Sequence, residues 1–174
     1  IVASVLPGLD PVHKISIVQR GFGALGYTMQ LPLEDRYLMQ RKDLLAQLAV
    51  LLGGRTAEEI ALGEISTGAQ NDLQRATDIA RAMVTEWGMS DSLGAINYDG
   101  HKRNKFLDIP MGPERGAYAE DTARLIDAEV KRSMPDAHTE ARRILTERRD
   151  ELESVTRRLL EIEVMEGEEL RQML

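Results

Sequence analysis

The residue in this chain with the clearest capacity for chemistry is Asp72. It follows a polar, turn-forming run at residues 66–71 and begins an amphipathic helical pattern. An aspartate in a first helical turn can accept hydrogen bonds from free backbone N–H groups and faces the positive end of the helix dipole. The same carboxylate could bind a metal, but a catalytic zinc site needs three protein ligands and keeps a fourth position for water. From spacing alone, the helix-terminus role is the simpler interpretation.

The histidines of this chain do not complete such a site. His13, His101 and His138 stand at no spacing typical of metal ligands. His13 falls in a strand-like segment, His101 begins a basic stretch and His138 lies in a charged helical segment, so ordinary surface or half-buried histidines are expected. Cysteine is absent, which excludes thiolate ligands, a cysteine nucleophile and disulfides. Any bound metal must therefore be held by histidine, aspartate or glutamate.

Two adjacent glutamates, Glu58 and Glu59, follow a Gly-Gly-Arg-Thr-Ala segment within a helical pattern. Exposed helical glutamates are the simpler interpretation. A glutamate on the apolar side of the helix needs a partner, because an isolated buried carboxylate is costly. Either residue is therefore a candidate partner for the second ring nitrogen of a metal-bound histidine.

The segment Leu25, Gly26, Tyr27 and Thr28 is a candidate substrate-binding strand. A glycine in a strand is most simply a weak point in the sheet. The alternative is an edge strand whose exposed backbone pairs with an extended peptide. No glycine-rich loop leads into an apolar helical pattern here, so nucleotide binding within this chain is not expected.

Composition restricts the class of protein. At 174 residues the chain has the length of about one domain. Hydrophobic residues make up 43% and aromatic residues only 4%, so the core must be largely aliphatic, which suits helix-on-helix packing. The net charge of −7 argues against nucleic-acid binding, which needs clustered basic side chains. No apolar run reaches the roughly 18 residues of a membrane-spanning helix.

The N-terminal part predicts a helix end and two strands. Residues 1–8 are apolar up to a Pro-Gly breaker and predict the last turns of a helix. Residues 12–18 and 25–31 are rich in β-branched and apolar side chains, so each predicts a strand. Together they predict a hairpin or a small sheet within residues 12–31.

From residue 41 onward the apolar pattern has a helical period. One predicted face consists of Leu44, Leu48, Leu51 and Arg55. The pair Gly53-Gly54 within this pattern is expected to permit close approach of another backbone, because each glycine costs roughly 1 kcal/mol of helix propensity. The next predicted face consists of Asp72, Ala76, Ile79, Ala80, Met83 and Trp87.

The last third is helical, highly charged and interrupted by Pro135. Proline lacks an N–H and clashes with the preceding turn, so a kink or a restart of the helix is expected there. A short helix is predicted at residues 168–174. The predicted fold is mainly α, with a small β-hairpin or sheet near the N-terminus, in one domain over residues 1–174 whose residues 41–174 are helical.

Ordered motifs along nearly the whole chain resemble the peptidase domain of FtsH-type, membrane-anchored, ATP-dependent zinc peptidases. The residues at 97–113 match least. The matching segments are Asp-Pro-Val-His-Lys at 10–14, Ala-Leu-Gly-Tyr-Thr at 24–28, Leu-Leu-Gly-Gly-Arg-Thr-Ala-Glu-Glu at 51–59, Ser-Thr-Gly-Ala-Gln-Asn-Asp at 66–72, Met-Val-Thr-Glu-Trp-Gly-Met-Ser at 83–90, Thr-Ala-Arg-Leu-Ile-Asp at 122–127 and Gly-Glu-Glu-Leu at 167–170.

The resemblance implies a mostly helical zinc peptidase domain and assigns roles to the candidate residues. Asp72 matches the third zinc ligand of the family. Glu58 and Glu59 match acidic positions near the metal. The strand around Gly26 matches the edge that lines the substrate cleft.

The resemblance also implies cofactors and partners that lie outside this chain. The family combines the peptidase domain with an AAA ATPase module, which binds ATP and magnesium, and with N-terminal membrane helices, and it assembles as a homo-hexamer. Threading driven by ATP delivers unfolded membrane and soluble proteins to the zinc sites. This domain is then expected in the cytoplasm at a bacterial inner membrane, or at an organelle membrane in a eukaryote.

The printed sequence departs from the family in one respect. It contains no His-Glu-x-x-His motif, which supplies the family's other two zinc ligands and its general base. Residues 1–8 resemble the sequence that follows this motif, so we expect the chain to start just after it and to be inactive alone. The alternative is a non-catalytic ring subunit or scaffold relative. An intact motif upstream would favour the peptidase, and a degenerate one the scaffold.

Overall fold

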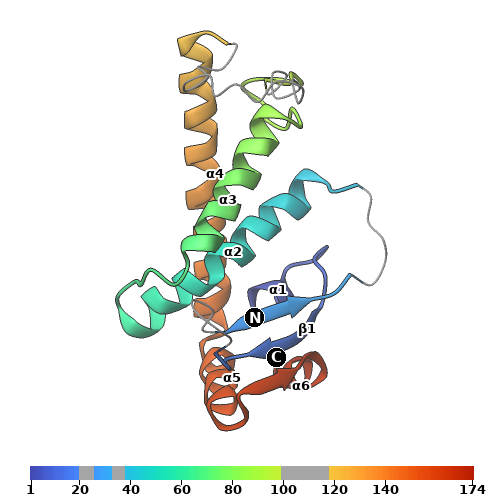
Figure 1. Ribbon diagram of the computed structural model, residues 1–174, viewed down its shortest axis with the longest axis vertical. Coiled ribbons are helices and arrows are strands. Elements are labelled where there is room, and N and C mark those ends of the chain that lie inside the picture. The colour runs from blue at the N-terminus through green and yellow to red at the C-terminus, as the bar shows by residue number, and fades with distance from the viewer. Residues whose placement is uncertain (20–25, 33–37, 99–117) are drawn as a thin grey trace.

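The computed structural model describes residues 1–19, 26–32, 38–98 and 118–174. It is mainly α with a small antiparallel sheet, as predicted (Figure 1). The described elements are α1 (Val2–Val5), β1 (Val12–Ser16), β2 (Tyr27–Gln30), α2 (Arg41–Leu62), α3 (Gln70–Thr85), α4 (Glu120–Glu147), α5 (Arg149–Ile162), β3 (Val164–Glu166) and α6 (Gly167–Met173).

Helices α2, α3 and α4 pack together around the larger hydrophobic core. The buried row of α2 runs through Leu44, Leu48 and Leu52. The predicted Leu51 is partly buried and packs against the same core. The predicted face of α3 is buried at Ala76, Ala80 and Met83. Its last predicted member, Trp87, lies beyond the end of α3 and is 48% exposed, so that assignment was wrong.

The two glycines of α2 differ in their surroundings. A Cβ atom on Gly53 would lie 3.3 Å from Cγ2 of Val2, whereas a Cβ atom on Gly54 would meet nothing within 4 Å. Only Gly53 therefore serves close packing, and its neighbour is a side chain of the short helix α1.

The sheet has the strand order β2-β1-β3, with both pairs antiparallel. The hairpin of β1 and β2 confirms the expectation for residues 12–31, although β1 ends at Ser16. The sequence analysis missed β3, because its three residues lie between two helical patterns. One face of the sheet joins α5 and α6 in a second hydrophobic core, which contains Val12, Val155, Met165 and Leu170.

Helix α4 continues through Pro135, so the predicted restart there was wrong. Residues on both sides of the proline, Val130 and Ala137, are buried in the larger core. Burial against α2 outweighs the local cost of the missing hydrogen bond. The helix ends at Glu147, because the next residue, Arg148, has non-helical backbone angles of φ −112° and ψ 39°.

Among the described helices, none combines the length and the apolar character that crossing a bilayer requires.

Candidate functional site

Asp72 is the third residue of α3 and is half-buried. Helix α3 begins after Ala69, whose methyl group cannot cap it. Among the described residues, the carboxylate of Asp72 makes no hydrogen bond and no ion pair. The buried Ala76 and Ala80 follow at four and eight residues, which places Asp72 on the inner side of α3. Its oxygens are therefore available to a ligand, and the capping hydrogen bond that the sequence allowed is not formed.

Glu58 holds the loop that leads into α3. Its carboxylate accepts hydrogen bonds from the backbone N–H of Ser66 at 2.9 Å and from Oγ of Ser66 at 2.8 Å. Oγ of Ser66 in turn accepts the backbone N–H of Gly68 at 3.1 Å. A Cβ atom on Gly68 would lie 3.2 Å from that Oγ atom. Glu58, Ser66 and Gly68, named here the Ser66 clamp, therefore order the segment that ends at Asp72.

The hydrogen bonds from Ser66 lower the pKa of Glu58 below its usual value of 4.5, with the backbone N–H contributing most. Among the described residues, the hydrogen-bond partner of Glu58 is Ser66; its pairing with a metal-bound histidine, for which either Glu58 or Glu59 is a candidate, stays a prediction. Sequence reasoning missed Ser66. The signal for it was a Ser-x-Gly sequence just before a helix, which is typical of a local turn with side-chain-to-backbone bonding.

Glu59 joins α2 to α4. His138 Nε2 lies 3.1 Å from its Oε2 atom, and Arg142 donates to the same oxygen. Arg55 lies 3.7 Å away on Glu59's own helix. This carboxylate therefore has three cationic or titratable neighbours. It connects α2 to α4, and, unlike Glu58, it does not bind the loop before α3.

The candidate substrate strand is β2. Leu25 lies outside the described residues, whereas Gly26 immediately precedes β2, and Tyr27 and Thr28 begin it. β2 pairs with β1 on one side and is an edge of the described sheet. A Cβ atom on Gly26 would lie 2.6 Å from the carbonyl oxygen of Ser16, so glycine is required for the close approach of β1 and β2.

The described residues do not by themselves form a metal site. In that part of the chain, no three His, Asp or Glu side chains converge as ligands. Asp72 fits zinc as a single ligand, because its half-buried carboxylate has no partner among the described residues and follows an ordered loop. His13 is exposed in β1, His138 is bound to Glu59, and His101 lies outside the described residues.

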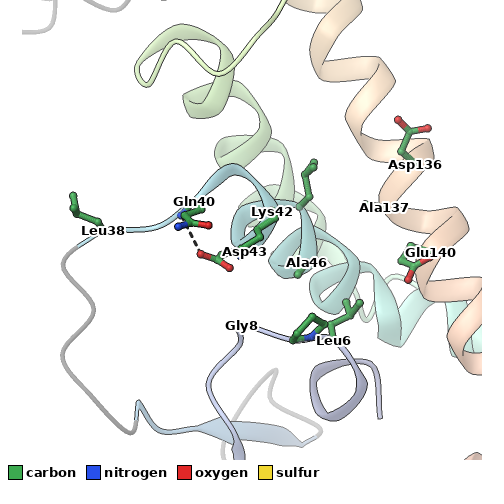
Figure 2. Close-up of a pocket in the computed structure, with 12 residues that line it drawn as sticks. Leu6, Gly8, Leu38, Gln40, Lys42, Asp43, Ala46, Asp136, Ala137 and Glu140 are labelled. Atoms are coloured by element: carbon green, nitrogen blue, oxygen red, sulfur yellow. Dashed lines mark hydrogen bonds between the residues drawn. The ribbon is translucent and has the colours of Figure 1, made fainter.

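Two hollows lie beside α2, the smaller one mostly along α3 and the loop before it. One, of about 440 Å³, is lined by Arg55, Ser66, Thr67, Gln70, Leu73, Gln74 and Thr77. The other, of about 740 Å³, lies between α2, α4 and the turn after α1 (Figure 2). Asp43, which accepts the backbone N–H of Gln40 at 3.0 Å, lines the second hollow, with Leu6 and Gly8 nearby. None of the described candidate site residues is among the residues that line either hollow.

Acid should open the Ser66 clamp. The pKa of Glu58 is lower in the folded chain than its usual value of 4.5. The hydrogen bonds of Glu58 therefore contribute fully to stability above pH 4.5, and this contribution is lost as the pH falls through the pKa of the folded state. We therefore expect the amides of residues 66–68 to lose protection against hydrogen exchange, relative to those of α3, as the pH is lowered. Glu58→Gln should show fast exchange at neutral pH as well, and Glu64→Gln is the matched control. Equal protection in Glu58→Gln and the unmodified chain would contradict this.

Comparison with known proteins agrees with the motifs. The model of peptidase family M41 matches residues 1–173. The chain is 54% identical over 172 residues to an ATP-dependent zinc metalloprotease FtsH of Syntrophobacter fumaroxidans, which covers 99% of this chain and 27% of that protein. It is 52% identical over 174 residues to FtsH 4 of Synechocystis, covering all of this chain and 28% of that protein.

A third relative, an ATP-dependent zinc metalloprotease FtsH of Pseudothermotoga lettingae, is 48% identical over 174 residues and again covers all of this chain and 28% of that protein. The chain thus spans little more than a quarter of the length of these relatives. The family match extends over both hydrophobic cores, the Ser66 clamp and the edge strand. The chain therefore belongs to peptidase family M41.

Proposed function

We propose that this chain is the peptidase domain of an ATP-dependent zinc metalloendopeptidase that degrades unfolded proteins. The observation that carries the proposal is Asp72, a half-buried carboxylate without a partner among the described residues, at the end of an ordered loop. Each of the three relatives above is named an ATP-dependent zinc metalloprotease.

In this proposal Asp72 is one zinc ligand, and two further ligands come from a His-Glu-x-x-His motif, which the printed sequence does not contain. Zinc, when bound, polarises the scissile carbonyl and lowers the pKa of its bound water. The Ser66 clamp keeps the first turn of α3 in place, so that Asp72 presents its oxygens in one orientation. Glu59 contributes at a distance, by joining α2 to α4.

The edge strand β2 binds the substrate in extended form. A free sheet edge pairs with the backbone of any extended peptide, so recognition depends little on the substrate's sequence. This suits a protease whose substrates are unfolded membrane and soluble proteins. Thr28 and Met29 are exposed on β2 and would contact the substrate's side chains.

The proposed ATPase module and membrane anchor belong to segments outside this chain. We propose a homo-hexamer whose AAA modules bind ATP and magnesium and thread the substrate. We also propose membrane anchoring by other segments, with this domain on the cytoplasmic side of a bacterial inner membrane or at an organelle membrane.

A peptide that cannot form backbone hydrogen bonds should be a poor substrate. In the protein that contains this chain, N-methylation of the substrate amides that face β2 should raise KM about tenfold or more, since each lost hydrogen bond contributes about 1 kcal/mol. The same peptide methylated outside the paired stretch is the control. Equal kcat/KM for both peptides would exclude edge pairing.

A further inference from the structure

The two halves of the proposed site belong to different hydrophobic cores. Asp72 lies on α3, which packs with α2 and α4 in the larger core. The strand β2 lies in the sheet, whose other members pack with α5 and α6 in the second core. In Figure 1, α5, α6 and the sheet lie in the lower part of the molecule, and α4 rises above them. The spacing between the carboxylate and the strand therefore depends on what joins the two cores.

The break between α4 and α5 is one such junction. Helix α4 ends at Glu147 and α5 begins at Arg149, with the non-helical Arg148 between them. Two consecutive arginines thus stand where the chain passes from the first core to the second. The side chains of Arg148 and Arg149 are 35% and 38% exposed, so both are largely covered.

Arg149 reaches back to the first core. Its Nη1 atom donates to the carbonyl oxygen of Ile60 at 2.9 Å. Ile60 lies in the last turn of α2, where carbonyl groups lack partners within the helix and the helix dipole favours a cation. Two residues earlier, Glu58 makes the Ser66 clamp. Arg149 is therefore connected through one helical turn to the loop that ends at Asp72.

Arg148 reaches into the second core. Its Nη1 atom donates to the carbonyl oxygen of Leu174 at 3.0 Å, just after α6. At the other end of α6, a Cβ atom on Gly167 would lie 2.0 Å from the carbonyl oxygen of Val12, so α6 lies directly against β1. β1 is the strand that pairs with β2. Arg148 is therefore connected through α6 and β1 to the substrate strand.

We propose that Arg148 and Arg149 are positioning residues that set the spacing between Asp72 and the substrate strand β2. The role in substrate positioning rests on the proposed peptidase function, whereas the spacing itself does not. Each arginine also pairs with a glutamate of α5, Glu151 at 3.3 Å or Glu153 at 2.8 Å, and these pairs keep each guanidinium aimed at its carbonyl. Both long-range bonds end on backbone carbonyls, so they constrain where helices lie.

The spacing can be measured directly, because the chain has no cysteine and introduced cysteines are the only labelling sites. Spin labels at Thr28→Cys on β2 and Arg75→Cys on α3 occupy exposed positions on the two sides of the site. Double electron–electron resonance then gives their distance distribution. We expect Arg149→Leu, and more strongly the double variant with Arg148→Leu, to shift the mean distance and broaden the distribution. Arg149→Lys, which can still donate to Ile60, should restore it in part.

Arg157→Leu is the matched control. Arg157 lies on α5, its side chain is 74% exposed, and within the described part of the chain its one ion pair is with Glu153 at 3.5 Å. The distance between the two spin labels in Arg157→Leu should have the same distribution as in the chain without this substitution. An unchanged distribution in Arg149→Leu and in the double variant, with native circular dichroism, would overturn the proposal. If the leucine variants do not fold, Arg149→Gln is measured instead, and its unchanged distribution would count equally against the proposal.

A kinetic measurement separates this proposal from the proposed function. In the protein that contains this chain, Arg149→Leu should raise KM for an extended peptide and leave zinc content unchanged. Failure of the peptidase function would appear as zinc content that does not respond to replacement of Asp72. Failure of the positioning role would appear as an unchanged distance distribution and an unchanged KM in a protein that does bind zinc.

Discussion

Asp72→Asn should abolish proteolysis by the protein that contains this chain while its ATP hydrolysis continues. Asparagine keeps the shape of the side chain and can remain in the first turn of α3, but it lacks the negative charge that holds a metal. Loss of a group that only supports a ligand weakens metal binding about 10- to 100-fold, so loss of the ligand itself should reach at least the upper figure. Zinc content by mass spectrometry and peptide release from unfolded casein are the measurements.

Asp78→Asn is the matched control for that experiment. Asp78 lies on the same helix, is exposed and accepts a hydrogen bond from Gln74 at 2.9 Å. Its replacement should change neither zinc content nor proteolysis. If Asp72→Asn retained both zinc and proteolysis, Asp72 would be a helix-terminus residue and would have no part in metal binding.

Gly167→Ala should be strongly destabilising. The added Cβ atom would lie 2.0 Å from the carbonyl oxygen of Val12 and 3.1 Å from that of His13. Both obstacles are backbone atoms of β1, so the start of α6 must move away from the sheet. We expect a loss of about 3 kcal/mol or more in the free energy of unfolding, at the upper end of overpacking effects.

Gly54→Ala, by contrast with Gly167→Ala, should stabilise the fold. A Cβ atom there meets nothing within 4 Å, and Gly54 lies within α2. The substitution should stabilise by about 0.5–1 kcal/mol, because alanine restricts the unfolded chain and favours the helix. Urea denaturation of both variants gives the two free energies. A Gly167→Ala variant as stable as the unmodified chain would mean that α6 is not held against β1 as described.

Much of this molecule follows from local sequence. The strands at residues 12–18 and 25–31, the helices from residue 41 and the short terminal helix were predicted from side-chain periodicity and breakers, and the family was predicted from ordered motifs. These features depend on residues close together in the chain, whose spacing a sequence displays directly. The position of Asp72 in the first turn of a helix belongs to this class, and its metal-binding role stays a prediction.

Other features depend on contacts between distant segments, which no local pattern encodes. Pro135 stays within α4 because the helix buries Val130 before it and Ala137 after it in the larger core, so packing outweighs a local breaker. Strand β3 forms because β1 offers it a backbone edge. Glu59 joins His138, which lies 79 residues away, and Arg149 bonds Ile60 across 89 residues.

The sequence by itself therefore determined the elements, their order and the residue types available for chemistry. Only the tertiary structure decided which partner each charged side chain has. Glu58 and Glu59 are adjacent residues of the same type on one helix, so the sequence alone does not distinguish their roles. One orders the loop before Asp72 and the other joins two helices, because successive side chains on a helix point about 100° apart and so face different neighbours.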